Sequence, residues 1–157
     1  MTRTPPIWTP HATVAVVVED DQGRFLMVQE SSHGHIVFNQ PAGHVEEHEQ
    51  ITEAALRETL EETGWQVRLD YFLGLYTYIA PANGVTYYRF CFAATALCKI
   101  TDKLDDDIIA AHWLSLEELK ARESQLRSPL ILKCIEDYRN GRRFPLDVIV
   151  EAQTPPG

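Results

Sequence analysis

The length, composition and charge of this chain exclude several classes of protein. At 157 residues, with 45% hydrophobic and 24% charged residues, it has the composition of one ordinary globular domain. No apolar run approaches the roughly 18 residues of a membrane-spanning helix, and a net charge of -9 disfavours nucleic-acid binding, which depends on lysine and arginine. We expect a cytoplasmic single domain over residues 1–157, without nucleic-acid or membrane partners. Its core should lie at about 11–150, with flexible termini and a disordered tail at 153–157.

The first part of the chain is typical of β-strands. Residues 11–18 form a β-branched apolar run, and residues 24–29 form a second run beyond the polar, glycine-containing stretch 19–23. We interpret the two runs as a hairpin at the opening of a sheet. Residues 36–43 end in proline, alanine and Gly43, so the chain must leave any strand there and continue as a loop.

The strongest helix prediction covers residues 49–63. This stretch contains neither proline nor glycine, and Gly64 stands where a C-terminal cap is expected. Beyond it, residues 67–79 and 85–97 are rich in aromatic and β-branched side chains and are separated by strong turn residues. They should pair as antiparallel strands.

The last third of the chain predicts one strand and two helices. Residues 108–114 are a short strand candidate, and residues 115–119 have the pattern of a capping-box helix start. The pair Ser128-Pro129 opens a second helix, which should end before Gly141.

Three glutamates share one face of the helix predicted at 49–63. At about 100° per residue, Glu58, Glu61 and Glu62 fall within an arc of roughly 100°, and Arg57 lies beside Glu61. Like charges at these spacings repel, so a compensating cation is expected. A set of oxygen ligands without histidine or cysteine favours Mg²⁺, with Mn²⁺ as a substitute, over zinc. On this geometry alone, a merely solvated helix face remains the alternative.

The opposite side of the same helix can face a core. Its residues are Thr52, Ala55, Leu56, Thr59 and Leu60.

The spacing of fixed residues around this helix resembles the Nudix box. Gly43 is followed by five residues and Glu49, and then by seven residues and the run Arg57-Glu58-Thr59-Leu60-Glu61-Glu62-Thr63-Gly64-Trp65. The family signature has a glycine, a glutamate, Arg-Glu, a Glu-Glu pair and a second glycine at these spacings. Thr59 is the one departure, because the family usually has an aliphatic residue there, and it concerns packing rather than chemistry.

The resemblance implies a fold and a set of roles. The fold is α/β, a Nudix-type α/β/α sandwich with a central mixed sheet, and the likeness covers roughly residues 11–140. The metal ligands would be the backbone carbonyl of Gly43 and the carboxylates of Glu58, Glu61 and Glu62. Either Glu58 or Glu61 would act as the base, and Arg57 would belong to the catalytic set by holding Glu61. Glu49 and Gly64 would be structural.

Other candidates stand outside the box. Asp107 lies in an acidic run where some family members add a metal ligand, and a solvated acidic loop is its alternative. Arg89 lies on a predicted strand and meets either a substrate phosphate or an acidic neighbour. We assign it to substrate binding together with Arg127, which lies in a segment that resembles one bacterial phosphatase branch of the family. His44 and His48 are interpreted mainly as surface residues.

The resemblance implies a Mg²⁺-dependent hydrolase in which a metal-activated water attacks a phosphorus of a diphosphate. The expected substrates are nucleoside di- or triphosphates, or small organic pyrophosphates similar to thiamine pyrophosphate, with release of orthophosphate. The expected assembly is a monomer or a homodimer. One alternative is a pyrophosphohydrolase of an oxidised nucleotide, a nucleotide sugar or a dinucleoside polyphosphate. Another is a non-catalytic Nudix-fold ligand sensor, which the retained carboxylates disfavour.

Overall fold

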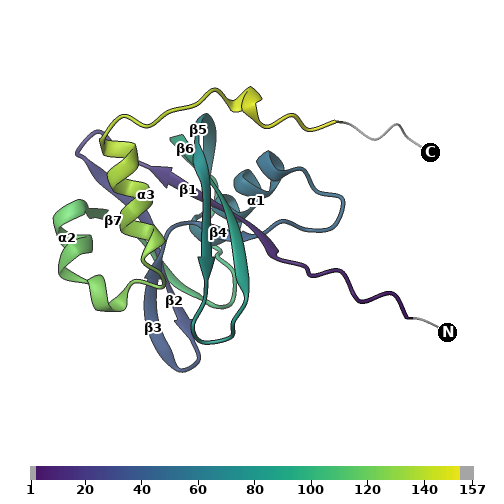
Figure 1. The fold of residues 1–157 in the computed structure, drawn as a ribbon. Coiled ribbons are helices and arrows are strands. Elements are labelled where there is room, and N and C mark those ends of the chain that lie inside the picture. Colours follow the sequence, from purple (N-terminus) through teal and green to yellow (C-terminus); the bar gives the residue numbers. More distant parts are fainter. Residues whose placement is uncertain (1–2, 153–157) are drawn as a thin grey trace.

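The computed structural model describes residues 3–152 and contains two β-sheets with helices packed around them (Figure 1). The predicted disordered tail at 153–157 lies outside the described residues. The four-stranded sheet has the order β4 (Ala42–His44), β1 (His11–Val18), β6 (Thr86–Lys99) and β5 (Trp65–Ile79). The three-stranded sheet has the order β3 (His35–Asn39), β2 (Arg24–Ser32) and β7 (Ile108–Ser115). The helices are α1 (Ile51–Thr63), α2 (Leu116–Ala121) and α3 (Leu130–Arg139), with short 3₁₀ turns η1 (Glu123–Gln125) and η2 (Leu146–Val148).

The four-stranded sheet is mixed, as expected. Strands β1 and β6 run parallel, whereas β4 with β1 and β5 with β6 are antiparallel. Two apolar clusters form the core, and β1 and β6 contribute to both. One cluster joins these strands to α3, and the other joins them to α1. The helices therefore cover opposite faces of a mixed sheet, which confirms the α/β class.

The predicted hairpin between the first two strands is wrong. Strand β1 pairs with β4 and β6, whereas β2 pairs with β3 and β7. Within residues 3–152, their ends are linked by the isolated bridge between Glu19 and Phe25. The reason is burial on both faces, because Ala15 belongs to the cluster under α3 and Val14 to the cluster under α1. A strand buried on both faces has a continuous apolar run, and such a run does not reveal its partners.

The helix α1 starts two residues later than expected and turns a different side to the core. It begins at Ile51, so Glu49 lies in the turn before it. Its buried residues are Ala54, Ala55, Thr59, Glu62 and Thr63. Leu56 and Leu60 are exposed, which contradicts the expectation that they face a core. Small side chains on the buried side allow α1 to lie close to the sheet.

Thr59 shows how the one departure from the Nudix box is accommodated. Its side chain is fully buried, and its hydroxyl donates to the backbone carbonyl of Ala55 at 2.8 Å. A buried hydroxyl with a hydrogen-bond acceptor avoids the cost of an unpaired polar group.

The starts of α2 and α3 follow the sequence signals. At α2, the Ser115 hydroxyl accepts from the Glu118 amide at 3.1 Å, and the Glu118 carboxylate accepts from the Ser115 amide at 3.2 Å. At α3, the Ser128 hydroxyl accepts from the Leu130 amide at 3.2 Å. The predicted capping box and the predicted helix after Ser128-Pro129 are confirmed.

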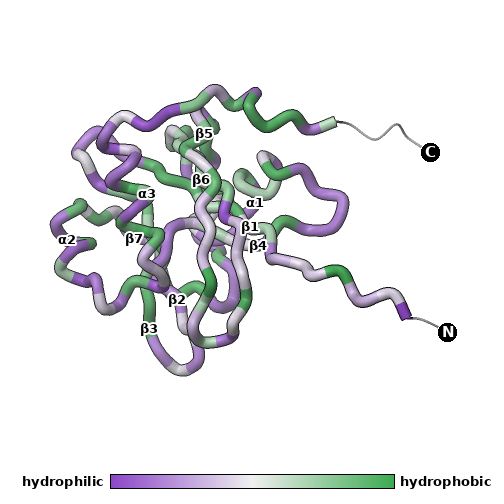
Figure 2. Tube along the Cα trace, in the orientation of Figure 1, coloured by the Kyte–Doolittle hydropathy of each residue, from purple (hydrophilic) through white to green (hydrophobic). Residues whose placement is uncertain are grey.

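The N-terminus of α1 is capped from the other end of the chain. The N-cap residue Gln50 makes no side-chain cap, and the Glu151 carboxylate instead accepts from the Ile51 amide and, at 2.8 Å, from the Thr52 hydroxyl. Figure 2 shows a hydrophobic stretch just before this point, and within it Leu146 and Ile149 pack on the core cluster under α1. The C-terminal segment therefore holds the helix that carries the Nudix box.

Removing the cap at Glu151 should destabilise the protein without touching the cavity. We expect Glu151→Ala to lower the free energy of unfolding by about 1 kcal/mol, the usual effect of losing a helix cap. Urea denaturation followed by circular dichroism measures this change. The control is Glu136→Ala on the exposed side of α3, which should be neutral. Equal stability of the two variants would contradict the capping role.

Candidate active site

An open cavity of about 580 Å³ has residues of both sheets in its lining. One group of its lining residues is acidic and includes Glu58, Glu62, Asp105 and Asp107. Arg89 and Arg127 also line it, together with the buried Glu30. The cavity therefore combines groups that bind cations with groups that bind anions.

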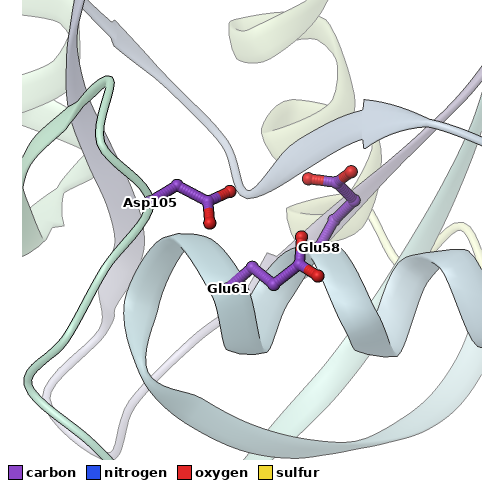
Figure 3. A group of neighbouring side chains, drawn as sticks. All are labelled: Glu58, Glu61 and Asp105. Carbon is purple, nitrogen blue, oxygen red and sulfur yellow. The ribbon is translucent and has the colours of Figure 1, made fainter.

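Three carboxylates converge at the edge of this cavity. Glu58 and Glu61 project from α1, and Asp105 reaches toward them from the loop before β7 (Figure 3). Their ligand oxygens lie within 4.8 Å of one another. All donors are carboxylate oxygens, and no histidine or cysteine of the described residues joins the group, so the set fits Mg²⁺ or Mn²⁺.

Burial and mutual repulsion affect the charge of this cluster. Burial raises the pKa of Glu58 above its usual range, the charges of Glu61 and Asp105 raise it further, and Arg57 opposes both effects. Burial also raises the pKa of Asp105, with the charge of Glu61 as the next cause. A divalent cation would relieve this repulsion directly.

Arg57 links the box together from the middle of α1. Its Nη1 donates to Glu58 at 2.8 Å and to Glu61 at 3.1 Å, while its Nε donates to Glu49 at 2.7 Å. Its Nη2 donates to Glu49 at 3.0 Å and to the backbone carbonyl of His44, also at 3.0 Å. The hydrogen bond to Glu49 is the main cause that raises the pKa of Arg57. Arg57 thus contacts Glu61, as the sequence predicted, and Glu58 as well.

Glu49 ties the preceding turn to the helix. Its carboxylate also accepts from the Glu46 amide at 3.0 Å, and the hydrogen bond from Arg57 is the main cause that lowers its pKa. Glu49 lies before the first residue of α1, and its ion pair with Arg57 is its principal interaction.

Glu62 lies deeper than Glu58 and Glu61. It is 7% exposed, and its carboxylate accepts from the Ala42 amide at 2.8 Å, so it joins α1 to β4. Burial is the main cause that raises its pKa to about 9, and the charges of Glu58, Glu30 and Asp107 add to the effect.

The two glycines of the box each allow a close approach. A Cβ at Gly43 would overlap the carboxylate of Glu58, so any larger residue there would displace that carboxylate from its present position. Gly64 has φ of 78°, its amide donates to the Leu60 carbonyl at 2.8 Å, and a Cβ there would overlap the Thr101 carbonyl. The predicted helix end at Gly64 is confirmed.

The structure groups Asp105, rather than Asp107, with Glu58 and Glu61 of α1. The Asp105 amide donates to the Glu61 carbonyl at 3.0 Å, and the Asp105 carbonyl accepts from the Ile108 amide at 2.9 Å. Asp107 lines the cavity beyond this turn, and its role as a ligand stays a prediction. The sequence did not single out Asp105, because it is one of three adjacent aspartates. Only the folded backbone shows which of the three side chains lies beside Glu58 and Glu61.

The two predicted substrate-binding arginines have different partners. Arg89 is 8% exposed, and its Nη2 donates to the side-chain oxygens of Asn39 at 3.3 Å and Gln40 at 2.9 Å. Arg127 donates from Nη1 to Glu30 at 2.6 Å. The partners of Arg89 are therefore two side-chain amides and not the acidic neighbour that the sequence left open. Glu30 and Gln40 were missed, because nothing in their local sequence marks these long-range contacts.

The two box histidines are exposed, in agreement with their interpretation as surface residues. His48 lies 3.5 Å from the Glu47 carboxylate, away from the cavity. His44 lies at the cavity edge, where its Nε2 is 3.0 Å from Nδ1 of His11. Burial, with the nearby His11 and Arg127, lowers the pKa of His44.

Comparison with known proteins identifies the family. The family model of the NUDIX domain matches residues 9–134. The chain belongs to the Nudix family. It is also 40% identical over 151 residues to "Phosphatase NudJ" of Shigella boydii serotype 4 (strain Sb227) and of Escherichia coli (strain K12), covering 95% of this chain and 96% of each relative. These matches confirm the expected family and the resemblance to its phosphatase branch.

Solved structures agree with this assignment. A NUDIX hydrolase from Nitrosomonas europaea has a TM-score of 0.89 and 42% sequence identity, over 92% of this chain and 98% of that one. A structure described as a UDP-X diphosphatase shares the fold at 18% identity, with a TM-score of 0.72 over 88% of this chain and 68% of that one. The chain is thus a Nudix hydrolase that acts on phosphoric anhydrides. Separately, none of its helices within residues 3–152 is long and apolar enough to cross a bilayer.

Proposed function

We propose that this Nudix hydrolase is Mg²⁺-dependent and releases orthophosphate from nucleoside di- and triphosphates or from small organic pyrophosphates of the thiamine pyrophosphate type. The observation that carries the proposal is the convergence of Glu58, Glu61 and Asp105 beside a cavity that also contains two arginines. The 40% identity to proteins named phosphatase supports the release of orthophosphate.

The metal ligands would be the carboxylates of Glu58, Glu61 and Glu62 and the backbone carbonyl of Gly43, with Asp105 or Asp107 added from the loop. A bound divalent cation activates water and neutralises charge on the phosphate oxygens. Glu58 and Glu61 are the two candidates for the base that accepts the proton of the attacking water. Arg57 contacts both carboxylates, so it fixes whichever of them acts.

Arg89 and Arg127 would bind the phosphate oxygens of the substrate on the side of the cavity that carries them. Guanidinium groups suit this task because they offer several donors in one plane. Tyr78 and Tyr87 also line the cavity and can stack on an organic ring without selecting one base. Little base preference is therefore expected.

A screen of phosphorylated metabolites with Mg²⁺, scored by released orthophosphate, tests this function. We expect turnover of nucleoside di- and triphosphates or of small organic pyrophosphates. Hydrolysis restricted to nucleotide sugars, dinucleoside polyphosphates or oxidised nucleotides would favour another branch of the family.

Replacement of Arg57 by lysine tests its positioning role. Lysine keeps the charge but cannot reach Glu49, Glu58 and Glu61 with one planar group, so Arg57→Lys should lower kcat by about 10-fold or more while KM changes little. Steady-state kinetics with a nucleoside diphosphate separates the two parameters. The control is Arg68→Lys at the exposed ion pair with Asp70, which should leave both unchanged. An effect confined to KM would instead place Arg57 in contact with substrate.

A further inference from the structure

Arg89 is a buried cation without a direct ion pair among the described residues, and Asn39 separates it from the buried Glu30. Its two hydrogen bonds go to neutral amide oxygens, and no carboxylate of residues 3–152 forms an ion pair with it. Its Nε has no hydrogen-bond partner, and neither does Nε2 of the contacting Gln40. Among the described residues, these are the two buried side-chain polar atoms left unpaired. Both atoms are donors, so each lacks an acceptor. Of the two residues, Arg89 lines the cavity, and its positive charge makes an anion the favoured acceptor there.

Arg127 provides the contrast within the same cavity. Its side chain is 52% exposed, and it is paired at 2.6 Å with Glu30, which is 3% exposed. The charge of Arg127 is therefore already balanced by the protein. Of the two arginines, only Arg89 gains a first counter-charge when an anion enters the cavity.

The position of Arg89 determines which part of a ligand it meets. The exposed turn residues 81–83 contribute to the rim of the cavity, whereas Arg89 is buried in its lining. Gln40, in contact with Arg89, is 1% exposed and does not line the cavity, so the space closes at this pair. A group bound against this buried part of the lining can be the end of the ligand. A terminal phosphate fits, because it has several free oxygens and a higher negative charge than an esterified internal phosphate.

We propose that Arg89, supported by Gln40 and Asn39, binds the free terminal phosphate of the substrate and makes the enzyme selective for diphosphates with one unesterified end. This inference rests on the proposed function and narrows its substrate class. Nucleotide sugars and dinucleoside polyphosphates are esterified at both ends, so they offer no group for the Arg89 pair.

A comparison of ADP with ADP-ribose tests this selectivity, since the two share every group except the substituent on the terminal phosphate. The wild-type protein prefers ADP in kcat/KM. Arg89→Gln lowers kcat/KM for ADP by about 10- to 100-fold, the effect of losing hydrogen bonds to a charged group, and leaves the low value for ADP-ribose unchanged. Arg127→Gln lowers both values by a similar factor and keeps the preference. An equal loss for both substrates in Arg89→Gln would overturn the inference.

Binding of inorganic phosphate to the metal-free protein gives a readout without turnover. In EDTA, isothermal titration calorimetry should detect phosphate binding to the wild type and to Arg127→Gln, weaker binding to Arg89→Lys, and none to Arg89→Gln. Urea denaturation of each variant verifies that it is folded. If Arg89→Gln does not fold, the comparison is made with Arg89→Lys. Undiminished phosphate binding in either folded Arg89 variant would overturn the inference. Phosphate binding that depends on Arg89 in a protein without hydrolytic activity would instead contradict only the proposed function.

Discussion

Glu58→Gln should reduce hydrolysis by on the order of 10² or more while the protein stays folded. Glutamine keeps the size of the side chain and its contact with Gly43. It loses the negative charge, which Glu58 needs both to bind a metal ion and to accept a proton from water. The same loss is expected for Glu62→Gln, because it removes a proposed ligand. Initial rates with a nucleoside diphosphate and Mg²⁺ measure both variants.

The Glu62 variant should also be more stable than the wild type at alkaline pH. In the metal-free protein, burial raises the pKa of Glu62 from its usual value of 4.5 to about 9. The folded state therefore holds a proton that the unfolded chain has released, and this contribution to stability is complete below the unfolded pKa and is lost as pH rises through 9. Glu62→Gln mimics the protonated form, so urea denaturation in EDTA should show a smaller loss of stability between pH 6 and pH 9 than in the wild type.

The matched control for both substitutions is Glu53→Gln, which changes an exposed glutamate on the same helix. It should leave rate and stability unchanged. Near-normal turnover in Glu58→Gln or Glu62→Gln would mean that the functional face of α1 has been misplaced.

Removal of divalent metal should abolish activity. Within residues 3–152, the one cation paired with the acidic cluster is Arg57, which is already bonded to Glu58 and Glu61, so a bound metal is needed there to balance the carboxylates and activate water. The reaction should therefore stop in EDTA and return with Mg²⁺ or Mn²⁺. Zinc should not be required, because the donors are all oxygen atoms. Circular dichroism in EDTA verifies that the fold persists. Full turnover in the chelator would refute the metal-dependent mechanism.

The residues of α1 could be predicted because their relations are local. A helix fixes the positions of Arg57, Glu58 and Glu61 relative to one another by its own geometry, and Gly64 marks its end. The pairing of residues 11–18 could not be predicted in the same way. Their partners in β6 lie 76 residues further along the chain, and an apolar run shows burial but not the identity of the neighbour.

The rest of the candidate site depends on contacts between distant segments. Asp105 joins Glu58 and Glu61 only because its amide bonds to the Glu61 carbonyl, and Glu30 pairs with Arg127 across 97 positions of sequence. The amide partners of Arg89 likewise come from a distant segment, the last residue of β3 and the residue after it. The orientation of α1 is also a tertiary effect, because its helical periodicity did not show that Leu56 and Leu60 would be exposed.

Phosphorus NMR of the products formed from a nucleoside triphosphate with Mg²⁺ tests the central claim most directly. The box determines where the metal binds but not how the phosphate chain lies across it, so the products report which bond is broken. We predict orthophosphate and the nucleoside diphosphate, followed by more orthophosphate and the monophosphate. Accumulation of pyrophosphate and the monophosphate, without the diphosphate, would contradict the account and place the attack at an internal phosphorus.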